Sequence, residues 1–164
     1  MIEMKDVNRE IRIIVNPFLK EIGFSLHHGK NYWAFPEGEV RMACIRAVGA
    51  YFSAVTGWPS MSLVVELGVY YPHRHEGASQ SHIKRDEEGR LLPKDWQCDR
   101  KYTLTAGINQ DFYKKNLSNP AERKRIDIWW IDPDGSNLEE SIQDMKNSLG
   151  LRALEWFNGE DGKS

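Results

Sequence analysis

The chain has 164 residues, of which 40% are hydrophobic and 28% are charged, and its formal net charge is −2 at pH 7. This length suits one domain, and the composition excludes an intrinsically disordered chain. The slight negative charge also excludes a general attraction to nucleic acid or anionic lipid, so binding to either would require a local basic patch. We expect one domain over residues 1–164, with a polar tail at 158–164.

The two cysteines and the N-terminal residues predict a cytoplasmic protein. Cys44 and Cys98 lie far apart and lack a CxxC spacing. The N-terminus carries acidic residues where a secretory signal has a basic segment and an apolar stretch. No apolar run approaches the roughly 20 residues of a membrane span. We therefore expect no association with a membrane.

The N-terminal segment has the spacing of an amphipathic helix. Between Met4 and Ile22, apolar residues recur every three or four positions, which places them on one helix face. Pro17 lacks an amide donor and crowds the preceding turn, so it predicts a kink or break. Gly23 predicts the C-terminal end of this segment.

A second amphipathic helix is expected near the C-terminus, with the apolar stripe Leu138, Ile142, Met145 and Leu149. Ser136 and Glu139 have the spacing of a capping box, which predicts the start of the helix. Gly150 predicts its end.

Several strands are expected between these helices. The clearest is Met61–Tyr71, because alternate residues are apolar along its whole length. A hairpin is expected from Phe24–His28 and Tyr32–Phe35, and further strands at Gln97–Thr105 and Ile126–Ile131. The pattern of Val40–Val48 fits a strand or a buried helix about equally, and we favour a strand because its neighbours have sheet patterns.

The order of helix, several strands and helix predicts an α+β fold. Because no crossover helices separate the strands, we expect a mainly antiparallel sheet of five or six strands, with the N-terminal and C-terminal helices packed on one face. Residues 72–95 are polar and contain glycine and proline, so they predict a long loop.

Short motifs occur along nearly the whole chain; they are Asn16–Phe24, Leu63–Pro72, the strand with Cys98 and Arg100, Trp129–Trp130 and Leu154–Phe157. Together they resemble the bacterial domain-of-unknown-function family numbered four thousand three hundred and four. The resemblance implies a single-domain cytoplasmic α+β protein and supplies no catalytic residues. Some similar proteins occur in toxin–immunity settings, which implies a role in protein binding.

Two chemical sites can be weighed near the polar loop. His73, His75, His82 and Cys98 have side chains that bind zinc, but histidines on a loop have no enforced geometry. We therefore favour solvated histidines and predict neither a metal nor a cofactor. The alternative of an enzyme, of unidentified class, would place its site near His73, His75, Glu76 and Arg100.

Nucleic-acid binding is a further alternative, which the negative net charge disfavours. Segment 112–125 combines lysines and arginines with Phe112 and Tyr113, a combination that can bind single strands by charge and stacking. A solvated connection accounts for the same residues.

Aromatic residues favour a protein partner. Tyr51, Phe52 and Trp58 lie in an expected loop, Gly49–Ser60, and Trp129 is followed directly by Trp130, so one of this pair should point away from the core. Such residues, with Arg100, commonly anchor interfaces. The competing interpretation is that both sheet faces are covered and all these aromatic residues are buried.

We therefore interpret the chain as a protein-binding module of the immunity or adaptor type, with a toxin-like or other protein as its partner. Its candidate contact residues are Tyr51, Phe52, Trp58, Trp129 and Arg100. The absence of a complete catalytic motif favours binding over catalysis. The partner's identity and the oligomeric state stay open.

Overall fold

A computed structural model describes residues 1–107 and 125–159. It contains a five-stranded sheet in the order β1-β2-β3-β4-β7, in which every neighbouring pair is antiparallel. The strands of this sheet are β1 (Leu26–His28), β2 (Asn31–Ala34), β3 (Val40–Ala47), β4 (Leu63–Tyr70) and β7 (Arg100–Thr103). The predicted α+β class is confirmed, and Val40–Ala47 is a strand rather than a helix.

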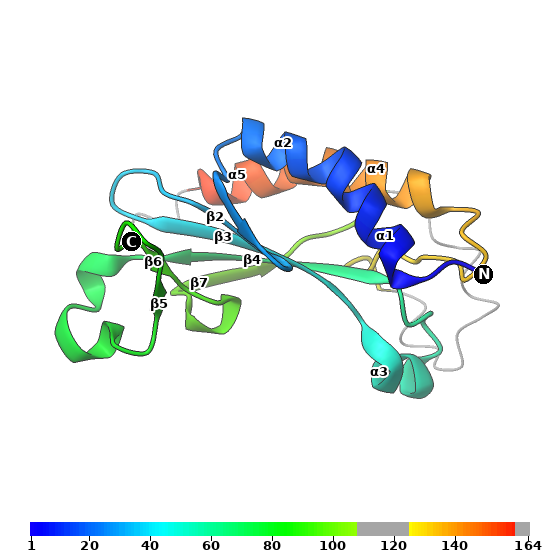
Figure 1. The fold of residues 1–164 in the computed structure, drawn as a ribbon, viewed down its shortest axis with the longest axis horizontal. Coiled ribbons are helices and arrows are strands. Elements are labelled where there is room, and N and C mark those ends of the chain that lie inside the picture. Colours follow the sequence, from blue (N-terminus) through cyan, green and yellow to red (C-terminus); the bar gives the residue numbers. More distant parts are fainter. Residues whose placement is uncertain (108–124, 160–164) are drawn as a thin grey trace.

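The terminal helices lie side by side across one face of this sheet (Figure 1). The N-terminal one comprises α1 (Met4–Glu10), a π-helical turn (Ile11–Val15) and α2 (Asn16–Glu21). The expected distortion at Pro17 takes the form of this turn, in which the Asn16 amide donates to the Ile11 carbonyl five residues earlier. The π turn keeps the backbone amides before Pro17 hydrogen-bonded, and Pro17 itself has no amide hydrogen to donate.

The C-terminal helix continues further than the sequence predicts. After α4 (Leu138–Ser148), a π-helical turn at Leu149–Ala153 leads into α5 (Leu154–Phe157), so Gly150 does not end the helix. A Cβ at Gly150 would lie 3.1 Å from the Phe18 ring. This glycine therefore permits close packing of the two helices instead of terminating one of them.

The predicted capping box is also wrong. The N-cap residue of α4 is Asn137, and no side-chain capping bond is present there. The Asn137 amide instead accepts a hydrogen bond from the Asp132 backbone and donates one to the Trp130 carbonyl. It thus fastens the start of the helix to the preceding segment.

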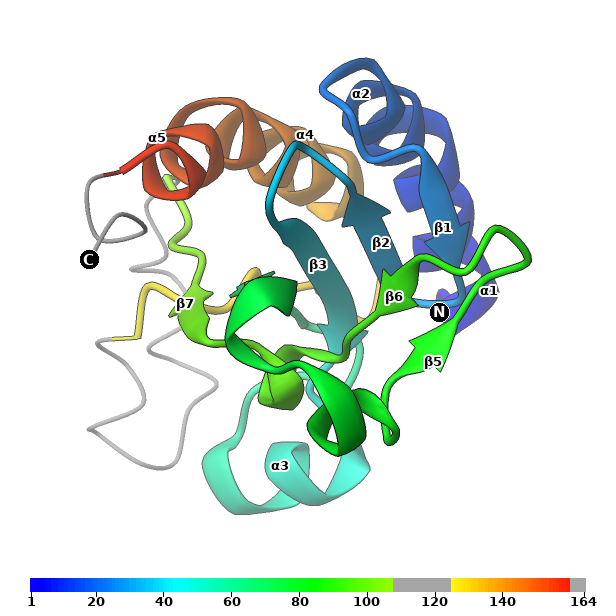
Figure 2. The same cartoon turned by 90° about the vertical axis from the view of Figure 1, so that its left-hand side faces the viewer.

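Strand β4 is buried on both faces, not on one as the alternation suggested. Toward the helices, Leu63, Val65, Leu67 and Val69 are at most 1% exposed. On the other face, Val64 and Tyr70 belong to two further buried clusters. Figure 2 shows α3 (Gly49–Thr56) and the β5–β6 region on this side.

Both segments that cover the second face were expected to be loops. Gly49–Thr56 is a helix, and its Phe52 packs against buried Trp58, Val64, Ile128 and Trp130. Within residues 72–95, β5 (Lys84–Arg85) pairs with β6 (Leu91–Leu92), and Ile83 and Leu91 are buried against the sheet. Apolar residues scattered through these polar segments supply the cover.

Two other predicted strand features differ in the structure. Ile126–Ile131 makes one isolated bridge, between Trp129 and Leu63, rather than a strand ladder. Cys98 precedes β7 and packs in the cluster on the second face, whereas Tyr102 and Leu104 pack against the helix side. Cys98 therefore lies on the opposite side of the sheet from Tyr102 and Leu104.

Gly68 provides a test of this second layer. A Cβ at this position would lie 2.5 Å from Cys98 Sγ and 2.9 Å from Cys98 Cβ. Gly68→Ala should therefore lower the free energy of unfolding by about 1–3 kcal/mol, measured by urea titration. In a Cys98→Ala background the loss should be smaller, because the sulfur is gone. Equal losses in the two backgrounds would contradict this packing.

Candidate functional site

The two buried tryptophans proposed as contact residues do not reach the surface. Trp58 is 1% exposed and Trp129 is 0% exposed. Trp129 and Trp130 do face opposite sides, but each lies in a buried cluster, so the expectation that one points to solvent is wrong. The reason is that α3 covers the face that alternation alone leaves open. For these tryptophans, the competing interpretation of two covered faces is correct.

Helix α3 nevertheless presents an apolar surface. Its exposed residues are Ala50, Tyr51, Ala54 and Val55, which we call the α3 outer face. The spacing of these positions places them on one side of the helix. Tyr51 is 85% exposed and Val55 57% exposed. The helix contains no charged residue, so the large side chains on this face have no charged neighbours within it.

Phe52 holds the inner side of α3 against the second-face cluster, and Thr56 stabilises the last turn of the helix. Phe52 is half-buried against the second-face cluster, and the Arg125 guanidinium lies 5.4 Å from its ring centre. The Thr56 hydroxyl donates to the Phe52 carbonyl at 2.7 Å. Phe52 therefore anchors the helix, while the side chain of Tyr51 beside it is exposed to solvent.

Arg100, the fifth proposed contact residue, is engaged elsewhere. Its guanidinium lies 4.5 Å from the Trp156 ring centre and donates to the Trp156 carbonyl at 3.1 Å. Tyr102 stacks on the same Trp156 ring, with 5.6 Å between the ring centres. These contacts join β7 to the C-terminal helix, which is a structural use of Arg100.

The histidines of the polar segment are dispersed. His75 hydrogen-bonds through Nε2 to Asp99 Oδ1 at 2.5 Å and stacks on Tyr70. His73 lies beside Tyr71 instead. Burial, with Asp95 and Asp99 nearby, raises the pKa of the Cys98 thiol to about 12. Among residues 1–107 and 125–159, no three side chains of the metal-binding types gather around one point, so His73, His75, His82 and Cys98 form no site there.

The basic segment 112–125 lies outside the described residues except for Arg125. That arginine pairs with Asp127 at 2.8 Å, which offsets its charge locally. No helix within the described residues is long and apolar enough to cross a membrane.

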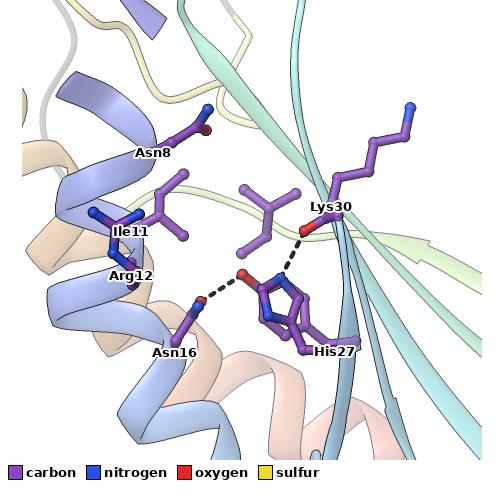
Figure 3. A pocket seen from close by; sticks show the side chains of 9 residues that line it. Asn8, Ile11, Arg12, Asn16, His27 and Lys30 are labelled. Atoms are coloured by element: carbon purple, nitrogen blue, oxygen red, sulfur yellow. Dashed lines mark hydrogen bonds between the residues drawn. The ribbon is translucent and has the colours of Figure 1, made fainter. Parts of the chain in front are cut away.

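A pocket that the sequence did not suggest lies between the N-terminal helix and the β1–β2 hairpin (Figure 3). Its volume is about 550 Å³. The helix contributes Asn8, Ile11, Arg12 and Asn16, and the sheet contributes His27, Gly29, Lys30, Tyr32 and Ile45. Asn8, Arg12 and Asn16 recur at intervals of four residues, which is a visible signal for a shared helix face.

Tyr32 and His27 form the ordered polar wall of this pocket. The Tyr32 hydroxyl donates to Asn16 Oδ1 at 2.5 Å, which joins the hairpin to the helix. The His27 ring stacks on Tyr32 with 4.2 Å between ring centres, and its Nε2 contacts the Gly29 carbonyl at 2.6 Å. Burial, together with nearby Cys44, raises the pKa of Tyr32 to about 12. The phenol therefore stays neutral at physiological pH.

The family model for a domain of unknown function, DUF4304, matches residues 15–159. The chain belongs to the DUF4304 family. The match spans both terminal helices of the described structure from Val15 onward and the whole sheet between them. No curated protein and no solved structure matches this DUF4304 protein. The resemblance seen in the sequence is thus confirmed, and the family carries no assigned activity.

The raised pKa of Tyr32 predicts a loss of stability at alkaline pH. Unfolded tyrosine ionises near pH about 10, whereas Tyr32 in the fold keeps its proton up to about 12. Stability should therefore fall between these two values, by on the order of 1 kcal/mol at pH about 11. Urea titrations at pH about 9 and 11 should show a larger loss for the wild type than for Tyr32→Phe. Equal losses would show that Tyr32 ionises alike in both states.

Proposed function

We propose that this DUF4304 protein is a protein-binding module of the immunity or adaptor type that contacts its partner through the α3 outer face. The observation that supports this proposal is the exposure of Tyr51 and Val55 on a helix without charges. Large apolar side chains grouped on one exposed face indicate an interaction surface more often than isolated ones do.

The position of α3 also suits a contact surface. The helix connects β3 to β4 and projects from the end of the sheet (Figure 1). Its inner side is fixed by the packing of Phe52, so the outer face is presented without a large loss of conformational entropy on binding. Ile126 is a further exposed apolar residue, at 60%, in the segment that reaches α3 through the contact of Arg125 with Phe52.

The chemistry of the outer face indicates the kind of partner. A protein that offers an apolar groove could accept Tyr51 and Val55 as adjacent anchors, because they lie one helical turn apart. The Tyr51 hydroxyl would need a hydrogen-bond acceptor in that groove, since buried tyrosine hydroxyls usually have a partner. The groove should itself lack charged side chains, because α3 has no charge to pair with them.

The two alternatives have less geometric support. Arg100 is held by Trp156, while His75 pairs with Asp99, so the groups expected of a catalytic site have separate partners in the described part of the chain. The basic segment expected to bind nucleic acid lies almost wholly outside the described residues. A protein partner is therefore the function that the described geometry favours.

A matched pair of variants tests this proposal. Tyr51→Ser combined with Val55→Ser should weaken binding to the partner by at least about tenfold, because truncating interface anchors costs more than about 1 kcal/mol. Leu151→Ser is the control, since Leu151 is 69% exposed on the C-terminal helix, away from α3. The partner is first captured by the wild-type protein under native conditions and then titrated against all three proteins.

Folding is checked by urea titration of each variant. We expect changes in stability within about 0.5 kcal/mol, because the substituted side chains are exposed. Equal binding by the double variant and by Leu151→Ser would overturn the proposal. It would also be overturned if sedimentation showed a wild-type dimer that the double variant dissociates, because α3 would then bind a second copy.

A further inference from the structure

The charged side chains at the pocket between the N-terminal helix and the β1–β2 hairpin are basic. Arg12 and Lys30 are exposed at its rim together with His27, and no aspartate or glutamate among the described residues lines it. Neither Arg12 nor Lys30 forms an ion pair within residues 1–107 and 125–159. Long cationic side chains at a rim can move over a bound ligand, so the entrance favours anions.

Arg12 differs from every other arginine that the structure describes. The others form ion pairs, donate hydrogen bonds or lie over aromatic rings; they are Arg9, Arg41, Arg46, Arg74, Arg85, Arg90, Arg100, Arg125 and Arg152. Arg12 has none of these contacts within the described part of the chain. Its planar donors are therefore available for an oxyanion, which they can bind in a bidentate manner.

The inner wall supplies further donors. Because the Tyr32 hydroxyl donates to Asn16 Oδ1, it fixes the orientation of that amide. The amide nitrogen of Asn16 then has both its hydrogens free of any described partner. Asn8 lines the same side of the pocket two helical turns earlier. Neutral amides beside an arginine are suited to an oxygen-rich head group.

The floor of the pocket is apolar. Ile11 is 8% exposed and Ile45 5% exposed, and the stacked rings of His27 and Tyr32 form the adjoining wall. The volume of about 550 Å³ is within the range of small-molecule sites and exceeds what an isolated inorganic anion requires. A ligand of this pocket should therefore combine a charged head with an apolar body.

The local backbone agrees with a binding role. Ile11 and Arg12 belong to the π-helical turn Ile11–Val15, and π turns within helices occur frequently at functional sites. We infer that this pocket binds a small organic anion, with its phosphate or carboxylate group held by Arg12, Lys30 and Asn16 and its apolar body resting on Ile11 and Ile45. No lining residue belongs to α3, so this site is separate from the proposed partner surface.

The inference is tested with defined probes on the full chain. Phenyl phosphate and benzoate both carry an oxyanion and an aromatic ring, and they distinguish between the two head groups. Inorganic phosphate lacks the ring, and benzyl alcohol lacks the charge. Binding is followed by NMR through the methyl groups of Ile11 and Ile45, which line the floor. We expect one of the two aromatic anions to shift these methyl signals and to bind at least tenfold tighter than either incomplete probe.

Two substitutions show whether the cation is specific. Arg12→Gln should weaken binding of the aromatic anion at least tenfold, whereas Arg9→Gln should leave it within twofold. Arg9 lies on α1, pairs with Asp6 and does not line the pocket. Both arginines are exposed, so neither change should alter the urea midpoint appreciably.

Three results would overturn the inference. The first is the absence of any shift at Ile11 and Ile45 with all four probes. The second is equal affinity for benzyl alcohol and the aromatic anions, which would remove the role of charge. The third is an equal effect of Arg12→Gln and Arg9→Gln, which would reduce the interaction to general electrostatic attraction.

Discussion

The antiparallel pairing of β3 with β4 is the constraint on which the rest of the structure depends. The pairing runs from Val40 opposite Tyr70 to Ala47 opposite Leu63 without interruption. Since β4 also pairs with β7, it has a partner on each side and apolar side chains on each face. Such a strand requires cover on both faces. The terminal helices cover one face, and α3 and residues 72–98 cover the other. The α3 outer face and the pocket beside the N-terminal helix therefore both lie on segments that cover this sheet.

The two surfaces arise where a cover meets solvent. In α3, the side toward the sheet is used for packing, and the side away from it keeps apolar residues that packing does not require. In the N-terminal helix, Val7, Val15 and Leu19 enter the core, while Asn8, Arg12 and Asn16 face the hairpin. Each helix thus separates a structural side from one available for binding.

Local periodicity explains what the sequence could predict. The alternation in β4 and the helical stripes depend on neighbours along the chain, so the elements and the α+β class follow from them. The burial of Trp58 and Trp130 depends on α3, whose own pattern is too short to distinguish a helix from a loop. Gly150 likewise has a role only because Phe18 approaches it from another helix. The pocket needed both Asn16 and Tyr32, and nothing local to either residue predicts their contact.

The π turn at Ile11–Val15 places a limit on insertions and deletions in the first helix. Each residue of an α-helix turns the chain by about 100°, so removing one residue from this turn would rotate everything before it by that angle. Val7 would leave the core, and Asn8 would no longer face the hairpin. Among related sequences, the number of residues between Val7 and Asn16 should therefore vary less than the identity of the outward-facing residues in this segment.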